Sequence, residues 1–311
     1  MRNFIIDTDT ASDDAVAIVM MLRAKDINVQ AITCVAGNLD LPKTVRNALL
    51  SVQFAGTYKP PVYAGAAKPM FRELMHVEDC PHGEDGFGNT FYPDAEQKAE
   101  KEHAVDKIIE LVKNATEDIE ILALGPLTNL ALAVVLAPDV MKKVKRITAM
   151  GGQFKMMNDC TPNAEFNIWQ DAEATKIVLE SGIPITLCPL DICYGTTEID
   201  RADREKLRSF HTQVGDFFID CNACLLQYNI DSYDKDIISM PDPTAAAVVI
   251  APDMVEDYRE CHAEIEVKSP DGYGQLLYDF RHLSGKPINC TLITKINPDR
   301  FKQLVFDTAS Y

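Results

Sequence analysis

Four aspartates, Asp7, Asp9, Asp13 and Asp14, lie within eight residues near the start of the chain. Two carboxylates held about 4 Å apart repel each other by roughly 4 kcal/mol at an effective dielectric constant near 20. Asp7 and Asp9 are two positions apart on an extended segment, so their side chains point the same way. Asp13 and Asp14 stand where a helix is expected to begin, and its dipole relieves each charge by at most about 1 kcal/mol. A hard divalent cation with oxygen ligands would offset the repulsion of all four. The spacing therefore predicts a metal site rather than a solvated acidic turn.

The segments around this cluster alternate between strands and helices. Runs typical of buried strands lie at 3–7, 29–37, 119–124, 144–152 and 183–191, and helical runs at 13–25, 42–56, 103–115, 126–137 and 170–182. Ser12 is available as the N-cap of the first helix. After about residue 195 the pattern is more helical, over 214–229 and 243–251, before strand-like runs at 262–269 and 288–296. This alternation predicts a mainly parallel, doubly wound α/β sheet flanked by helices, in a single domain spanning 1–311.

Polar or glycine-rich segments follow several of the predicted strands. They read DTDTASDD (7–14), AGNLD (36–40), ALGPLTN (123–129) and AMGGQFKMMNDCTPNAEFN (149–167). Ligands bind outside the carboxyl ends of the strands in a sheet of this kind. We therefore expect the four segments to converge on one crevice that contains the acid cluster.

Composition narrows the class of protein. The net charge of −17 argues against binding to nucleic acid or to an anionic membrane, both of which need a basic surface. No apolar stretch approaches membrane-spanning length, and the first residues do not resemble a signal peptide. Nine cysteines, including the pair Cys221 and Cys224 in a C-x-x-C, show no regular disulfide framework. We interpret them as reduced, mostly buried thiols of a cytoplasmic protein.

The stretch IIDTDTASDDAVAI (5–18) resembles the opening signature D-x-D-x-x-x-D-D-A of the inosine–uridine-type nucleoside hydrolases. Six further motifs follow in that family's order: AGN (36–38), HGEDGFGN (82–89), LGPLTNLA (124–131), MGG (150–152), AEFN (164–167) and DP (242–243). The resemblance implies an enzyme that hydrolyses the N-glycosidic bond of a ribonucleoside to free base and ribose, with one Ca²⁺ in its site. Relatives are commonly dimers or tetramers, so it also implies a homodimer or homotetramer.

The resemblance assigns roles around the metal. Asp9, Asp14 and Asp242 match the calcium-ligating carboxylates, and Leu124 matches the residue whose backbone carbonyl is a further ligand. Asp9 also matches the general base, which takes a proton from a calcium-activated water as its oxygen attacks C1′. Asp7 matches an aspartate that supports the cluster.

A second group of residues matches the sugar pocket of the family. Asp13 corresponds to the residue that binds the ribose 2′- and 3′-hydroxyls, and Asn38 to another residue of the pocket. Glu165 and Asn167 match residues on the 5′-hydroxyl side, and Met150 matches one that packs against the sugar. Cleavage of a glycosidic bond develops positive charge in an oxocarbenium-like transition state. An anionic pocket stabilises that charge more than it stabilises the neutral ground state.

Three positions depart from the family's pattern. Residues 10–12 read Thr-Ala-Ser, where the family usually has a tight turn containing Pro-Gly. Asp159 stands in place of an asparagine that contacts the sugar, and Asn158 beside it would substitute if the loop shifted by one residue. Pro241 replaces the histidine that many relatives place before the last calcium aspartate as an acid for the departing base. Proline cannot donate a proton, and a positioned acid contributes about 10²–10⁴-fold to the rate.

Other side chains are candidates for the missing acid. His82, in the glycine-rich loop, is the first, and Tyr228 and Tyr233 are the second. Gln227 is a candidate for contact with the base, whereas we expect Trp169 to pack beneath the pocket.

Two alternative functions remain open from the sequence. The replacements at Pro241 and Asp159 are compatible with a protein that binds a ribosyl compound with weak or altered turnover. The pair Asp7 and Asp9 also suggests a haloacid-dehalogenase-type phosphatase with Mg²⁺, although this leaves DDAVA, GPLTN and AEFN unexplained. The preference for purine or pyrimidine nucleosides is not determined by these motifs.

Overall fold

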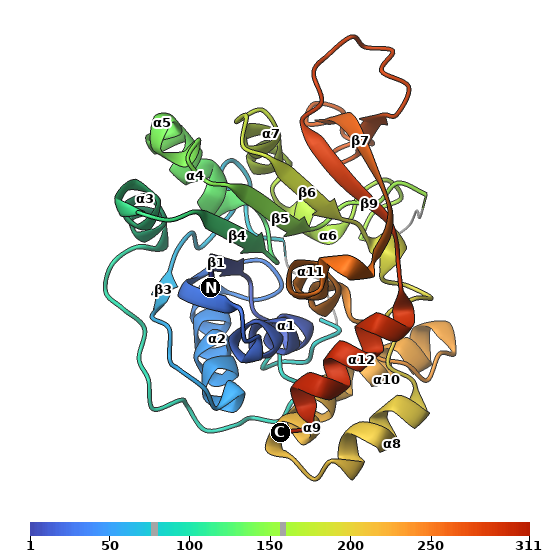
Figure 1. Ribbon diagram of the computed structural model, residues 1–311. Coiled ribbons are helices and arrows are strands. Elements are labelled where there is room, and N and C mark those ends of the chain that lie inside the picture. The colour runs from blue at the N-terminus through green and yellow to red at the C-terminus, as the bar shows by residue number, and fades with distance from the viewer. Residues whose placement is uncertain (76–79, 156–159) are drawn as a thin grey trace.

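The computed structural model describes residues 1–75, 80–155 and 160–311. Within these residues, nine strands form one sheet in the order β3-β2-β1-β4-β5-β6-β9-β7-β8 (Figure 1). The strands are β1 (Arg2–Thr8), β2 (Ile27–Cys34), β3 (Val62–Ala64), β4 (Ile119–Ala123), β5 (Arg146–Met150), β6 (Ile185–Cys188), β7 (Val255–Ile265), β8 (Leu276–Asp279) and β9 (Cys290–Ile296). Neighbours from β3 to β9 run parallel, whereas β7 is antiparallel to both β9 and β8.

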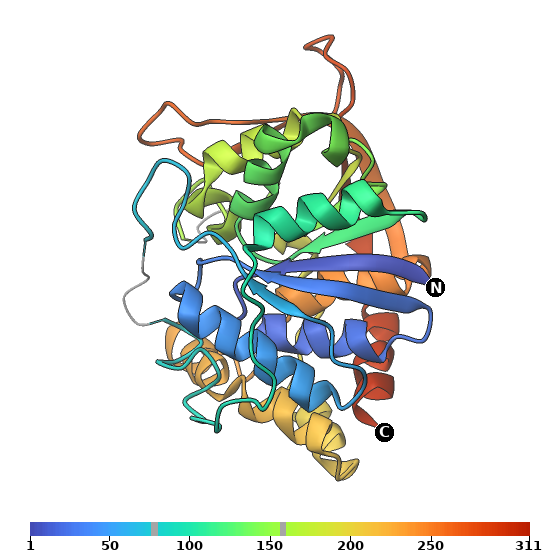
Figure 2. The ribbon, with the colours of Figure 1, turned by 90° about the vertical axis from the view of Figure 1, so that its left-hand side faces the viewer.

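Helices cover both faces of the sheet (Figure 2). One face carries α1 (Ser12–Arg23), α2 (Leu41–Ala55), α11 (Pro241–Ile250) and α12 (Pro298–Ala309), and the other carries α3 (Ala104–Asn114), α4 (Thr128–Leu136) and α7 (Ala172–Leu179). The remaining helices are α5 (Pro138–Met141), α6 (Phe166–Gln170), α8 (Arg201–Ser209), α9 (Gln213–Asp220) and α10 (Ala223–Tyr233), with short 3-10 turns η1 (Leu190–Ile192) and η2 (Pro252–Met254). The predicted doubly wound α/β architecture is confirmed.

The first strand shows why the sequence folds in this way. Phe4 and Ile6 pack into the core beneath α1 and α2, while Ile5 packs into the core beneath α3 and α4. All three side chains are buried, because a parallel strand in the middle of a two-sided sheet has no solvent face. This burial fixes β1 in the centre and therefore sets where the acidic segment after it emerges.

The start of the first helix differs from the prediction. α1 begins at Ser12 with Ala11 as its N-cap, so Ser12 is not the capping residue. The Asp14 carboxylate instead accepts a hydrogen bond from the Ala11 N–H at 2.9 Å. This leaves the Ser12 hydroxyl available for another partner.

Other boundaries also differ. The run predicted as one helix over 214–229 is two helices, α9 and α10, separated at Cys221 and Asn222. The Asn222 side chain turns back and donates to the Phe218 carbonyl at 2.9 Å, which occupies an acceptor at the end of α9. The short strands β3 and β8 were not predicted, because strands of three and four residues carry little periodicity. The helices α8 and α12 were not predicted either.

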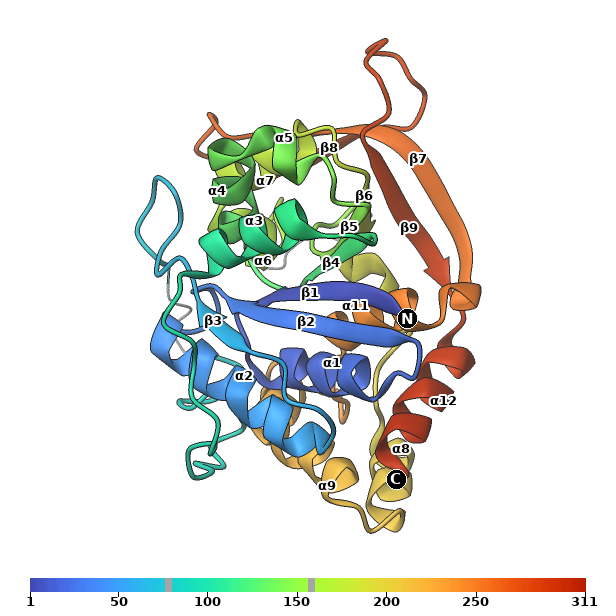
Figure 3. The same cartoon turned by 60° about the vertical axis from the view of Figure 1, so that its left-hand side comes forward.

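Parallel pairing brings the ends of the central strands to one edge of the sheet (Figure 3). Asp7 of β1 pairs with Ala123 of β4, and Ala123 pairs with Ala149 of β5. The segments that follow these strands therefore start side by side. None of the helices in the described segments is long and apolar enough to cross a bilayer.

Candidate active site

A cavity of about 340 Å³ opens at this edge of the sheet. Its lining includes the predicted site residues Asp13, Asn38, His82, Leu124, Met150, Glu165, Asn167, Tyr228, Tyr233 and Asp242. Asp159 lies outside the described residues, so the structure does not bear on its predicted role. The fold thus brings together residues from seven separate segments of the chain, at 13, 38, 82, 124, 150–167, 228–233 and 242.

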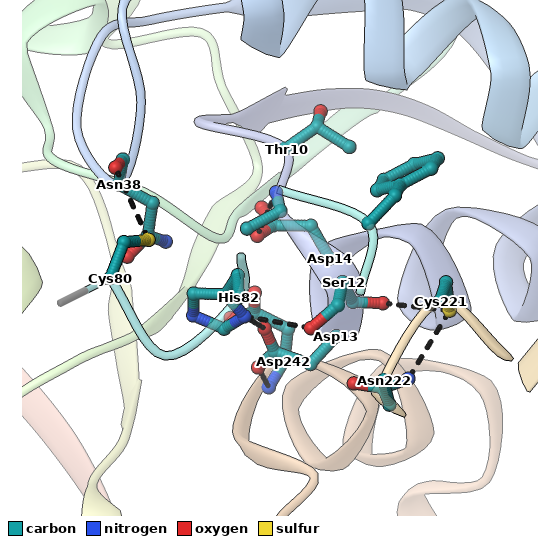
Figure 4. A network of polar contacts seen from close by, with 12 residues as sticks. Thr10, Ser12, Asp13, Asp14, Asn38, Cys80, His82, Cys221, Asn222 and Asp242 are labelled. Atoms are coloured by element: carbon teal, nitrogen blue, oxygen red, sulfur yellow. Dashed lines mark hydrogen bonds and ion pairs between the residues drawn. The ribbon is translucent and has the colours of Figure 1, made fainter. Parts of the chain in front are cut away.

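Asp13, Asp14 and Asp242 form an acidic triad, two of whose members, Asp13 and Asp242, line the cavity (Figure 4). Asp13, Asp14 and Asp242 each offer a carboxylate oxygen, and these oxygens lie within 4.8 Å of one another. All three residues are buried. This set differs from the predicted ligands in one member, because Asp13 takes part in the triad and Asp9 does not.

Local contacts hold the triad in place. The Thr8 hydroxyl donates to Asp14 Oδ1 at 2.5 Å, and the Asp242 N–H lies 3.4 Å from Asp13 Oδ2. Asp242 is in the first turn of α11, so its own backbone N–H has no partner within that helix. Two helix N-termini, those of α1 and α11, therefore meet at the triad, and their positive ends favour negative charge there.

Charge is nevertheless strongly disfavoured at Asp14 and Asp242. Burial raises the pKa of Asp14 to about 7, and the negative charge of Asp13 adds to the shift. Burial and the charges of Asp14 and Asp13 raise the pKa of Asp242 well above its ordinary value. Without a cation, these two carboxylates therefore hold a proton at neutral pH far more than an ordinary aspartate does. A divalent cation would supply the missing positive charge, and the carboxylate oxygens are the hard ligands that Ca²⁺ prefers.

Asp9 lies beside the triad and is completely buried. Its Oδ2 accepts a hydrogen bond from the Asn38 N–H at 2.6 Å, whereas Oδ1 has no hydrogen-bond partner among the described residues. Burial and the charge of Asp14 raise the pKa of Asp9 well above its ordinary value. A buried acceptor without a partner is rare in folded proteins. Asp9 Oδ1 is therefore an available ligand for a cation or an acceptor for a proton of a bound water.

The Asp7 carboxylate, at the end of β1, is hydrogen-bonded to side chains of neighbouring segments. Its Oδ1 accepts from the Thr33 hydroxyl at 2.6 Å and from the Asn129 amide at 2.8 Å. The Asn129 amide also donates to the Cys34 carbonyl at 3.1 Å and accepts from the Ala66 N–H at 2.8 Å. Asn129 thus ties together the ends of β1, β2 and β3. We did not single it out from the sequence, although it ends the GPLTN motif.

Residues of α6 form the wall on the side assigned to the 5′-hydroxyl. Glu165 is the N-cap of α6 and accepts hydrogen bonds from the Asn167 N–H and the Gly152 N–H, both at 2.9 Å. The Asn167 amide donates to the Leu124 carbonyl at 2.8 Å. A carbonyl oxygen has two lone pairs, so this bond leaves one for a second partner. The Asn167 amide also approaches Met150 Sδ at 3.4 Å, which fixes both side chains along the wall.

His82 also lines the cavity. Its Nδ1 is 2.7 Å from the Ser12 hydroxyl and 3.9 Å from Asp13 Oδ1 (Figure 4). Burial lowers the pKa of His82, and the Asp13 carboxylate opposes part of this shift. The loop that carries His82 is anchored by Asp85. Its carboxylate accepts hydrogen bonds from the backbone N–H groups of Phe87, Asn89 and Phe91 at 2.8–2.9 Å.

Aromatic side chains border the mouth of the cavity. Tyr228 and Tyr233, both on α10, meet edge to face with ring centroids 6.0 Å apart. Gln227 is not among the lining residues, and its amide donates to the Asp231 carboxylate at 2.8 Å. Trp169 is not a lining residue either and packs against the core beneath α4 and α7. Lining residues that we did not predict include Cys80, Tyr194, Leu225, Asn229 and Ser239.

Comparison with known proteins agrees with this geometry. Residues 4–303 match the family described as inosine-uridine preferring nucleoside hydrolase. The pyrimidine-specific ribonucleoside hydrolase RihB of Escherichia coli (strain SE11) is 34% identical over 308 residues, covering 98% of this chain and 96% of that protein. The solved structure of a plant nucleoside hydrolase, PpNRh1, superimposes with a TM-score of 0.93 at 29% identity, covering 99% of both chains. A purine-preferring ribonucleoside hydrolase from Gardnerella vaginalis gives a TM-score of 0.91 at 27% identity, also covering 99% of both chains.

The fold and the acidic cavity are therefore those of a nucleoside hydrolase, an N-glycosidase. The chain belongs to the inosine-uridine preferring nucleoside hydrolase family. The matched region includes Asp7 and Asp9, so the two carboxylates that suggested a phosphatase belong to the signature of this family.

Proposed function

We propose that this enzyme hydrolyses the N-glycosidic bond of ribonucleosides with the help of a divalent cation, Ca²⁺, and with Asp9 as the general base. The observation that carries the proposal is the buried acidic triad beside Asp9, whose Oδ1 has no hydrogen-bond partner among the described residues. Such a group of carboxylates is costly to bury and fits a cation better than any other occupant.

The cation would be held by Asp9, Asp14 and Asp242, with the Leu124 carbonyl as a further ligand. Asp13, which the family resemblance assigns to the sugar hydroxyls, is also within reach because its carboxylate belongs to the triad. Bound there, a divalent cation lowers the pKa of a water molecule and makes it a better nucleophile.

The residues of the chain perform the remaining steps. Asp9 accepts a proton from the attacking water as its oxygen bonds to C1′ of the ribose. Asp13 and Asn38 bind the sugar hydroxyls on one side, and Glu165 and Asn167 bind the 5′-hydroxyl side. The carboxylates stabilise the positive charge that develops on the sugar as the bond to the base breaks. The products are ribose and the free base.

His82 is the proposed donor to the departing base. As the C1′–N bond breaks, its electron pair stays on the base nitrogen, and the His82 ring donates a hydrogen bond to the negative charge that develops on the base, which then takes a proton from water. Pro241 lines the same cavity but has no proton to give. His82 and the proline are on different segments, so the histidine replaces the usual acid in function rather than in sequence position. Tyr228 and Tyr233 are the second candidates, because both line the cavity.

Pyrimidine ribonucleosides are the first substrates to test. The relative from Escherichia coli that is 34% identical is named pyrimidine-specific, whereas the purine-preferring neighbour is 27% identical. We further propose a homodimer or homotetramer, and a cytoplasmic location, on the family resemblance and the reduced thiols.

Steady-state hydrolysis of uridine, cytidine and inosine, with and without a chelator, tests the proposal. We expect turnover that the chelator abolishes and Ca²⁺ restores. Asp9→Asn should reduce kcat by at least about 10²-fold while leaving thermal unfolding cooperative. Asp191→Asn, which changes a carboxylate outside the cavity lining, is the matched control and should keep most of the activity.

The same assay distinguishes the alternative of a ribosyl-binding protein with weak or altered turnover. Binding of uridine or ribose by calorimetry without any hydrolysis would favour that alternative. Cleavage of p-nitrophenyl riboside but not of nucleosides would show that the base acts and that the donor to the leaving group does not. Unchanged kcat in Asp9→Asn would remove Asp9 from the mechanism.

A further inference from the structure

The hydroxyl of Ser12 lies in an unusual setting for the first residue of a helix. Ser12 is completely buried, and its Oγ is 2.7 Å from His82 Nδ1, on a loop 70 residues away in the sequence. The backbone on both sides is fixed: Cys221 Sγ lies 3.6 Å from the Ser12 carbonyl, and the Gly88 N–H donates to the His82 carbonyl at 2.9 Å. The contact therefore joins two rigid segments.

The direction of this hydrogen bond follows from the available acceptors. A buried hydroxyl keeps its proton in a hydrogen bond. Among the described residues, His82 Nδ1 is the one acceptor within hydrogen-bond distance of Ser12 Oγ. Asp13 Oδ1 does not compete for Nδ1, because 3.9 Å is too long for a hydrogen bond. Ser12 is therefore the donor, and Nδ1 is the acceptor.

This direction sets the tautomer of the ring. A neutral imidazole whose Nδ1 accepts a hydrogen bond carries its proton on Nε2. His82 lines the cavity, and its second nitrogen lies on the side of the ring away from Ser12 (Figure 4). The described residues provide no hydrogen bond to Nε2, so its proton is free to meet a ligand in the cavity.

We infer that Ser12 is a positioning residue, whose hydroxyl holds His82 in the tautomer that presents Nε2–H to the base of the bound nucleoside. The inference rests on the proposed function, because it assumes that the base occupies the His82 side of the cavity. It implies a base that offers a hydrogen-bond acceptor next to its glycosidic nitrogen, as the ring carbonyl of a pyrimidine does. Ser12 acts through His82 and does not itself touch the substrate.

Leaving-group dependence separates this role from a general structural one. Ser12→Ala should lower kcat on uridine by at least about tenfold. Its kcat on p-nitrophenyl riboside, whose phenolate departs without a proton, should stay within about twofold of the parent value. Ser12→Thr keeps a hydroxyl and should restore most of the activity on uridine. Ser51→Ala, a buried serine on α2 that donates to the Asn47 carbonyl, is the matched control and should change neither substrate.

Nitrogen NMR of the histidine rings tests the tautomer directly. The chain has six histidines, and the signals that disappear in His82→Gln identify the one of interest. We expect a protonated Nε2 and an unprotonated Nδ1 in the parent protein, and a mixture of tautomers in Ser12→Ala. A proton on Nδ1 in the parent, or equal loss of activity on both substrates in Ser12→Ala, would overturn the inference. The spectrum decides the role of Ser12 even if no nucleoside is cleaved, in which case the proposed function fails instead.

Discussion

Gly37 lies directly against the carboxylate that we propose as the general base. A Cβ atom added at Gly37 would be 2.1 Å from Asp9 Oδ2 and 2.8 Å from Asp9 Cγ. Real Cβ atoms keep at least 3.0 Å from such neighbours, so Gly37→Ala must displace the carboxylate by about 0.9 Å. The three nearest atoms all belong to the Asp9 side chain, which makes the perturbation specific to this group.

The expected effect on catalysis follows from that displacement. A shift of about 1 Å in a reacting group costs on the order of 10²-fold in rate. We therefore expect Gly37→Ala to lower kcat on uridine about 10²-fold. Overpacking of this kind also lowers the free energy of unfolding by about 1–3 kcal/mol. Gly125 also lies against this carboxylate, because a Cβ added there would be 2.6 Å from Asp9 Oδ1.

The assay pairs kinetics with denaturation. The kcat on uridine and the urea unfolding curve are measured for the parent, for Gly37→Ala and for the control Gly272→Ala. At Gly272 an added Cβ would meet the Glu266 side chain at 3.3 Å and the Ser269 side chain at 3.5 Å, so the control should keep both activity and stability. If Gly37→Ala retained the parental kcat, the geometry of Asp9 would not govern the reaction, and its role as the base would be refuted.

Three further predictions concern the acidic cluster. Asp242→Ala removes one carboxylate of the triad, so the Ca²⁺ concentration for half-maximal activity should rise at least about tenfold; an unchanged calcium titration would exclude Asp242 as a ligand. In excess chelator, burial raises the pKa of Asp7 from 3.8 to about 7, so the folded state keeps a proton that the unfolded chain loses. The free energy of unfolding should therefore fall as pH rises from about 4 to 7, by up to about 4 kcal/mol from this group. Urea unfolding curves measured across this pH range should show that the free energy of unfolding falls less with pH in Asp7→Asn than in the parent. Asn129→Ala loses the buried hydrogen bonds to Asp7, to the Cys34 carbonyl and from the Ala66 N–H, and should lower the free energy of unfolding by about 2–4 kcal/mol. Equal urea midpoints for this variant and the parent would show that Asn129 does not tie the strand ends together.

Local patterns were sufficient to predict the framework of the site. The apolar run before Asp7 is buried on both faces, and such a run has few alternatives to a central parallel strand. The acidic segment that follows it must then emerge at the carboxyl edge of the sheet. The order of the motifs was sufficient to predict the family, because each motif is short but their spacing is restrictive.

Boundaries and short elements were predicted less well. The break between α9 and α10 depends on the Asn222 side chain, which bonds to a carbonyl within the same turn and leaves the apolar pattern unchanged. The start of α1 depends on Asp14 rather than Ser12, because the Asp14 carboxylate reaches back to the Ala11 N–H. In both cases a side chain has several backbone hydrogen-bond partners within reach, and the sequence pattern does not show which one it binds.

By itself, the sequence determined the class of fold, the family and the presence of an acidic cluster after the first strand. Only the tertiary structure decided which atoms of that cluster meet. The contact between Asp13 and Asp242 joins residues 229 positions apart, and the hydrogen bond from Ser12 to His82 joins residues 70 apart. The spacing of apolar residues along a segment predicts which of its faces is buried. The separation of side chains on different segments depends instead on strand order and helix packing, which are properties of the whole chain.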